Sequence, residues 1–437
     1  MTMAARLRRS VIGAAVLTLL AAGPSSAFSI DNYNYHYTTE YPENVTCVSA
    51  SAVTEINYIH RDTVSADYSH TIAWNWYNQA RFNGTDHDKY NYNNPPEAGL
   101  DPRAWAWLLW YWSPPHYSYH DYWSSSQSSV DSWLMYDIRD SDPAAGAIVF
   151  RGIHAVDVIG FSSTIDPDAG PATLTGFYIA DPWYTTTSYP NGNRQIAEPD
   201  GGTLGLLPGT WLSTSTWNAS YFLPYRDPTY ENAHGNTIWH GDYVAVLRTV
   251  DDAPSPSPTY DTMPTKYSDT HNGALFTPIL GTDLGSSTTG PLVAITTGIR
   301  SARIDATRFN VDLKDVRLGR TLHVESLSSD VAPYDLAEVI SHGAVVALAM
   351  LTSDATGVHL AGLQTAYAGN QLVTPAQARE SFANNGLSVV DVVAAWAPSA
   401  ASFEPFSPLY VATDPGGSEV VLTPSGQVSS PASLALP

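Results

Sequence analysis

Tyr41–Ile59 reads YPENVTCVSASAVTEINYI and contains Cys47, the only cysteine in the 437 residues of the chain. Apolar residues follow it at spacings of three and four, namely Val48, Ala52, Val53, Ile56 and Ile59. This period predicts an amphipathic helix that begins at Cys47. A sulfur at a helix N-terminus faces unpaired backbone N–H groups and the positive end of the helix dipole, and both favour the nucleophilic thiolate. The alternative interpretation of Cys47 is a small buried hydrophobic residue.

Residues 1–27 have the pattern of a secretory signal peptide. Three arginines precede an apolar run, Val11–Ala22, and the segment ends in Ser25-Ser26-Ala27, a small-residue cleavage site. The run is shorter than the roughly 20 residues that a membrane-spanning helix needs. We therefore expect a secreted, extracellular protein without membrane insertion. An unpaired cysteine is an oxidation risk in that compartment, so its presence suggests a function.

The chain is strongly acidic, with a formal net charge of −22. This charge disfavours nucleic acid and anionic membrane surfaces as partners. The histidines show neither an HExxH motif nor the Cys/His spacing of a zinc site, so we predict no metal and no other cofactor. The sequence does not indicate an oligomeric state.

The apolar period changes along the chain. Helical spacing continues in residues 66–82, 102–112 and 129–140, and period-two apolar segments follow at 146–150, 153–161, 175–180 and 242–249. Helices followed by strands predict an α+β fold with a helical half and an antiparallel sheet half. We place this first domain at residues 28–250.

A Pro/Ser-rich stretch predicts a domain boundary at residues 251–265, which we interpret as a linker. Residues 266–437 contain fewer aromatic residues. Two predicted hairpins, at 343–367 and 409–423, and a helix that opens at Thr374-Pro375 give a small C-terminal α+β module of unknown role.

Two further residues complete a possible catalytic set. A cysteine nucleophile needs a base, usually histidine, and the histidine needs a partner that fixes its tautomer. His154 opens the predicted strand in GIHAVDVIGF, and Asp181 ends the next strand in FYIADPW. If these strands are adjacent, His154 and Asp181 come within hydrogen-bonding reach.

The combination of a cysteine at a helix start, G-x-H-A-V-x-V-x-G-F and I-x-D-P-W resembles the secreted C39-like branch of the papain-like cysteine peptidases. The resemblance covers about Tyr41 to Arg248. It implies a helical half that carries the cysteine and a sheet half that carries histidine and aspartate. It also implies a Cys–His–Asp triad, here Cys47, His154 and Asp181, that hydrolyses amides through a thioester.

The sequence departs from the family at the oxyanion position. The family has a glutamine six residues before the cysteine, where this chain has Tyr41. Loss of one oxyanion donor slows turnover by about 100- to 1000-fold. We name Asn44 as the candidate replacement donor, beside the backbone N–H of Cys47, with the hydroxyl of Tyr41 as the alternative. Asp157 also stands where the family is apolar, and we expect it to face away from His154 as a surface or loop-pairing group.

The leading hypothesis is a secreted cysteine peptidase or amidase that acts on extracellular peptides or proteins. A second hypothesis is a catalytically impaired C39-like domain that binds peptides or glycans, because the glutamine is missing and residues 181–230 are rich in aromatic residues. A third is a thiol acyltransferase, which uses the same nucleophile with an amine as the acceptor.

Overall fold

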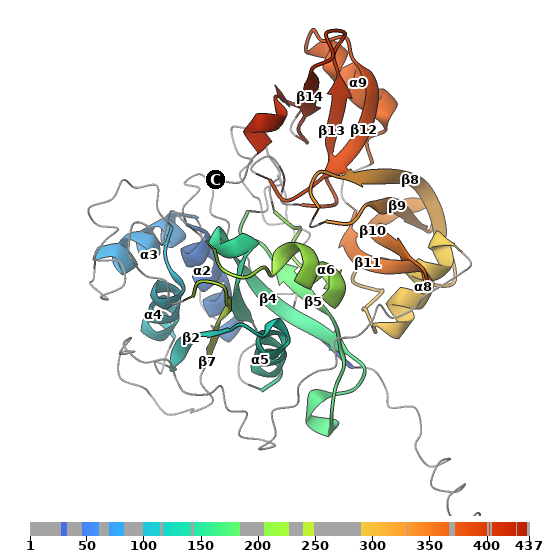
Figure 1. Cartoon of the computed structure of the whole chain (residues 1–437). Coiled ribbons are helices and arrows are strands. Elements are labelled where there is room, and N and C mark those ends of the chain that lie inside the picture. The colour runs from blue at the N-terminus through green and yellow to red at the C-terminus, as the bar shows by residue number, and fades with distance from the viewer. Residues whose placement is uncertain are drawn as a thin grey trace, which may run out of the picture.

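A computed structural model describes residues 28–32, 46–60, 70–82, 99–113, 117–140, 144–183, 205–226, 239–248, 290–329, 331–366, 372–399, 402, 404–424 and 426–434. The predicted signal peptide, the linker at 251–265, Tyr41 and Asn44 lie outside these residues. The described part has a mixed α+β fold with a large sheet, as the sequence predicts (Figure 1).

The helices are α2 (Cys47–His60), α3 (His70–Phe82), α4 (Pro102–Trp112), α5 (Gln127–Asp140), α6 (Thr214–Thr216), α8 (Pro291–Ser301) and α9 (Pro375–Asn384). Short 3-10 or π turns are η1 (Phe150–Gly152), η2 (Pro167–Ala169), η3 (Trp217–Tyr221) and η4 (Pro431–Leu434). The strands are β1 (Phe28–Asp31), β2 (Tyr119–Ser124), β3 (Ala145–Val149), β4 (His154–Ser163), β5 (Leu174–Ala180), β6 (Thr210–Ser213), β7 (Tyr243–Arg248), β8 (Arg317–Ser326), β9 (Tyr334–Ser341), β10 (Ala344–Asp354), β11 (Gly357–Thr365), β12 (Val390–Trp396), β13 (Leu409–Thr413), β14 (Glu419–Leu422) and β15 (Val428–Ser429).

The N-terminal part of the sheet has helices on both faces. Its strands run antiparallel in the order β6-β5-β4-β3-β7-β2. Successive side chains of a strand point to opposite faces. In β3, Ala147 and Val149 pack in the cluster of α5, while Ile148 packs in the cluster of α2, α3 and α4. This layering explains why these strands are apolar at consecutive positions rather than at every second one.

The helical layer was well predicted from the apolar period. Helix α2 begins at Cys47, and α4 begins at Pro102 after the N-cap Asp101, whose Oδ1 accepts a hydrogen bond from Ala104 N at 2.7 Å. Trp105 of α4 is fully buried against Gly146, where a Cβ atom would come within 2.6 Å of the indole. Trp105 and Trp107 of α4 therefore belong to the core, whereas Trp112 is 38% exposed.

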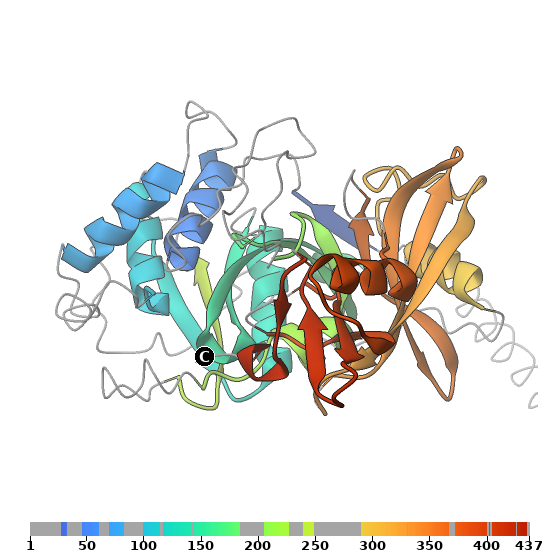
Figure 2. The same ribbon diagram turned by 90° about the horizontal axis from the view of Figure 1, so that it is seen from above.

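The C-terminal part continues the same sheet. Strand β11 pairs with β6 through Gly362 and Leu212 and through Leu363 and Trp211, and β10, β9 and β8 follow outward. The predicted hairpin is confirmed as β10 and β11. Figures 1 and 2 both show α2, α3 and α4 at one end of the molecule and β8–β11 at the opposite end.

Some elements were missed from the sequence. Strands β2, β6, β8 and β9 and helix α8 were not predicted. Strand β6 is the most consequential, because it joins the two parts of the sheet. In the described residues, no helix is long and apolar enough to cross a membrane.

Candidate active site

Cys47 lies in the first turn of α2 at the wall of a pocket. The pocket has a volume of about 70 Å³. Its lining includes the predicted base as well as the predicted nucleophile: Cys47, Val48, Gly99, Leu100, Pro102, Ile148, Gly152, Ile153, His154 and Tyr225. Cys47 itself is 7% exposed. The fold therefore brings Cys47 and His154, which are far apart in the sequence, to the same cavity.

His154 and Asp181 form a buried pair at the ends of adjacent strands. The distance between His154 Nε2 and Asp181 Oδ1 is 2.7 Å, and both side chains are 0% exposed. Strands β4 and β5 pair antiparallel with Asp157 opposite Ala180, so the start of β4 meets the end of β5. This is the juxtaposition that the sequence predicts.

Backbone groups fix the orientation of Asp181. Its Oδ1 also accepts a hydrogen bond from Trp183 N at 2.9 Å, and its Oδ2 accepts one from Leu206 N at 2.9 Å. Both carboxylate oxygens are thus held by donors that cannot rotate away. A carboxylate restrained in this way can hold the imidazole in one orientation.

Two aromatic rings flank His154. The indole of Trp183 stacks on the imidazole with centroids 3.3 Å apart and planes 11° apart. The ring of Phe150 lies at 6.4 Å, tilted by 18°. Trp183 follows Pro182 in the I-x-D-P-W motif, yet sequence reasoning gave it no role. In the structure, the indole of Trp183 covers the imidazole of His154.

A left-handed turn precedes His154. Phe150, Arg151 and Gly152 have φ values of 51°, 66° and 104°, and the first two are conformations that non-glycine residues rarely adopt. A Cβ atom at Gly152 would come within 2.7 Å of the Tyr225 ring. A hydrogen bond from Ile153 N to Phe150 O at 3.4 Å closes the turn, and one from Arg226 N to Arg151 O at 2.7 Å links it to a distant segment. Backbone strain of this kind persists where the surrounding structure enforces it, commonly at functional sites.

Burial dominates the titration of His154. Loss of hydration lowers the pKa of His154 below its ordinary value of 6.5, while the charge of Asp181 and its hydrogen bond act in the opposite direction. The net effect favours the uncharged imidazole at neutral pH. An uncharged imidazole can accept a proton, as a general base must.

The expectation for Asp157 was wrong. Asp157 is 1% exposed, and its side chain faces Glu55 and Ser51 of α2. It does point to the opposite face of β4 from His154, but that face is covered by the helix that carries Cys47. Burial raises the pKa of Asp157 well above its ordinary value of 3.8, and the nearby charge of Asp181 raises it further.

This burial predicts an unusual effect of Asp157→Asn on stability. The raised pKa means that folding favours the protonated carboxyl, so this contribution is fully present below pH 3.8 and is lost as pH rises towards the folded-state pKa. Asparagine does not ionise. We therefore expect the Tm difference, variant minus wild type, to rise between pH 4 and pH 7.5.

Asp166→Asn serves as the matched control, because the bond from Arg139 lowers the pKa of Asp166. Its Tm difference should stay nearly constant over the same range, because a lowered pKa gives a contribution that is lost only as pH falls below about 3.8. Each pKa unit between the folded and unfolded states corresponds to about 1.4 kcal/mol for a fully buried group. Thermal unfolding followed by circular dichroism measures both series. A pH-independent Tm difference for Asp157→Asn would contradict the assignment.

Comparison of the chain with protein-family models, with curated proteins and with solved structures finds no match. The function is therefore inferred from the chemistry and geometry of the pocket itself. Asn44, the predicted oxyanion donor, and Tyr41 lie outside the described residues. Within the described residues, no group of three or more His, Cys, Asp or Glu side chains is arranged to hold a metal ion.

Proposed function

We propose that the protein is a secreted cysteine peptidase or amidase with a C39-like, papain-like catalytic arrangement. The observation that carries the proposal is the shared pocket of Cys47 and His154 together with the 2.7 Å contact between His154 and Asp181. A thiol at a helix N-terminus, a buried imidazole and an orienting carboxylate are the three groups that thiol hydrolysis requires.

The proposed mechanism assigns one role to each residue. The N–H at Nε2 of His154 donates a hydrogen bond to Asp181. This leaves Nδ1 as the nitrogen that exchanges a proton with Cys47. His154 takes the thiol proton as Sγ attacks the carbonyl carbon, and it then protonates the leaving amine. The resulting thioester is cleaved by a water molecule whose proton passes to His154, which returns it to the thiolate of Cys47.

The pocket also indicates the size of the group that lies beside the scissile bond. A cavity of about 150 Å³ accommodates benzene, so about 70 Å³ accommodates a small aliphatic group of three or four carbons. Apolar side chains contribute to its walls, among them Leu100, Ile148 and Ile153. We therefore propose substrates with a small apolar residue next to the cleaved amide.

The rate of Cys47 alkylation as a function of pH tests this proposal. Iodoacetamide reacts with the thiolate, and a free thiol has a pKa near about 8.5. We expect the wild-type rate to persist well below that pH, and the rate in His154→Ala to fall towards the profile of a free thiol. Identical profiles in the two proteins would refute the pairing. Product analysis with and without an added amine then distinguishes hydrolysis from acyl transfer.

A further inference from the structure

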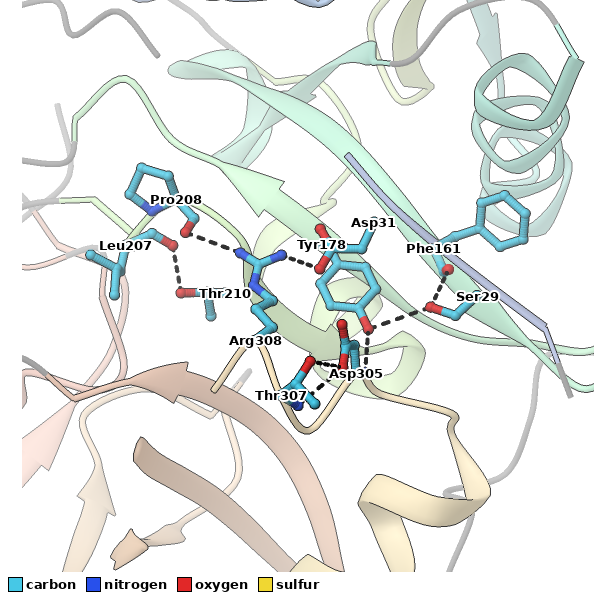
Figure 3. A network of polar contacts seen from close by, with 10 residues as sticks. All are labelled: Ser29, Asp31, Phe161, Tyr178, Leu207, Pro208, Thr210, Asp305, Thr307 and Arg308. Carbon is cyan, nitrogen blue, oxygen red and sulfur yellow. Dashed lines mark hydrogen bonds and ion pairs between the residues drawn. The ribbon is translucent and has the colours of Figure 1, made fainter. Parts of the chain in front are cut away.

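Arg308 joins three segments that are distant in the chain. Its guanidinium forms an ion pair with Asp31 of β1 and donates to Pro208 O at 3.4 Å. Figure 3 shows the guanidinium between these two acceptors, beside the ring of Tyr178. The side chain is 4% exposed, and its charge lies 5.4 Å from the Tyr178 centroid. A buried charge of this kind stays in place only where its partners are fixed.

Pro208 belongs to a tight turn that immediately follows Leu206, the residue that holds Asp181. The turn is closed by hydrogen bonds to Leu207 O from Thr210 N at 2.9 Å and from Thr210 Oγ1 at 2.6 Å. Gly209 N donates to Ile179 O at 2.5 Å, two residues before Asp181. The turn is therefore bonded to the end of β5 at both Ile179 and Asp181.

Gly209 gives Arg308 the room to reach this turn. Its φ is +75°, and a Cβ atom there would lie 1.2 Å from Nη2 of Arg308. The guanidinium therefore occupies the space that a side chain at position 209 would fill. Contact between Arg308 and the turn thus depends on the absence of a side chain at position 209.

The neighbouring contacts fix the loop that carries Arg308. Asp305 N donates to Tyr178 Oη at 3.4 Å, and that hydroxyl lies 3.4 Å from Ser29 Oγ (Figure 3). Phe309 is fully buried in the cluster that includes Tyr178 and Trp211. Arg308 thus extends from a loop that packs beside Tyr178.

We propose that Arg308 is a positioning residue for the His154–Asp181 pair: by clamping the 206–210 turn against β1, it keeps Leu206 N on Asp181 Oδ2. This inference deepens the proposed function and rests on it for its catalytic meaning. It also assigns the C-terminal segment a part in the active site. In this proposal, the geometry of the site depends on a residue of that segment, Arg308.

Titration of the His154 ring by NMR tests the proposal in the full-length protein with labelled histidine. The His154 signal is assigned by its absence in His154→Gln. Asp181 raises the pKa of His154, so Asp181→Asn should lower the midpoint of the His154 titration. The size of this shift is the reference for complete loss of the carboxylate. We expect Arg308→Gln to lower the midpoint in the same direction, because a loosened turn weakens the hold on Asp181.

Arg320→Gln is the matched control, since Arg320 is also paired with a carboxylate of the C-terminal segment, Glu338, but on β8 and β9. Its His154 midpoint should equal that of the wild type. If Arg308→Gln does not fold, Arg308→Lys is measured instead. Lysine keeps the charge near Asp31 but lacks the planar fork that serves two acceptors. A wild-type midpoint in the folded Arg308 variant, with Asp181→Asn shifted, would overturn the proposal.

The rate of Cys47 alkylation distinguishes failure of the proposed function from failure of the role proposed for Arg308. At pH 6 we expect Arg308→Gln to be labelled about tenfold more slowly than wild type, since small displacements of a catalytic group have effects of this size or larger. If wild-type and His154→Ala labelling are identical, the proposed function fails. The His154 midpoint still reports whether Arg308 holds Asp181.

Discussion

Hydrolysis should fall by about 10⁴-fold or more when Cys47 is replaced by alanine, because the proposed mechanism has no other nucleophile. His154→Gln should cause a comparable loss, since the thiol then lacks its base. The two losses should not add in the double variant, because the residues act as a unit. Release of fluorescent peptides from labelled casein by the purified protein measures the rate.

The chain provides a matched control for the histidine. His323 also contacts an aspartate, with Nδ1 at 2.8 Å from Asp335 Oδ1, but its side chain is 58% exposed and lies on β8 of the C-terminal segment. His323→Gln should retain wild-type hydrolysis. Unchanged hydrolysis in Cys47→Ala would rule out the thiol mechanism and favour a binding function for the pocket.

The second large effect concerns a fragment that ends at residue 249. We expect residues 28–249 alone to fail to fold, because the sheet would end at β6 with its pairing groups exposed. Side chains that pack beside β11, such as Leu212 and Trp211, would lose part of their cover. Each fully buried side chain of this kind contributes about 1.5–3 kcal/mol, and a domain is stable by only about 5–15 kcal/mol.

Specific polar contacts add to this loss. Thr216 Oγ1 donates to Ala361 O at 2.9 Å, and Asp31 would lose Arg308. Solubility, chromatography and circular dichroism of the fragment, compared with residues 28–437, measure the outcome. If the C-terminal segment instead shields the pocket, the fragment should be a folded monomer with activity equal to or greater than that of the full chain.

Local periodicity explains what could be predicted from the sequence. The start of α2 at Cys47, the cap of α4 at Asp101 and the strands that carry His154 and Asp181 all follow from apolar spacing and from capping residues. The neighbouring positions of His154 and Asp181 follow from the pairing of consecutive strands. These are short-range properties, so the sequence alone contains enough information.

The features that were missed or wrongly predicted from the sequence depend on contacts between segments that are far apart in the chain. Alternation correctly predicted the face of β4 on which Asp157 lies, but not that α2 covers this face. Strand β6 has four residues, and its partner β11 comes from the other end of the chain. The contact of Leu206 N with Asp181 spans 25 residues, and neither residue's pattern indicates it. Tertiary packing, rather than local secondary-structure propensity, determines which strand face is covered and which distant segments pair.

The pairing of β6 with β11 has a consequence for the order in which the chain acquires its structure. Thr216 and Ala361 are 145 residues apart, and Asp31 and Arg308 are 277 apart, so the sheet closes through contacts of very long sequence separation. Such contacts slow folding, because loop closure precedes the gain from pairing. A nascent chain that has emerged only as far as β7 lacks β11 and Arg308. The pairing of β6 with β11 and the ion pair of Asp31 with Arg308 can therefore form only after β11 has been synthesised.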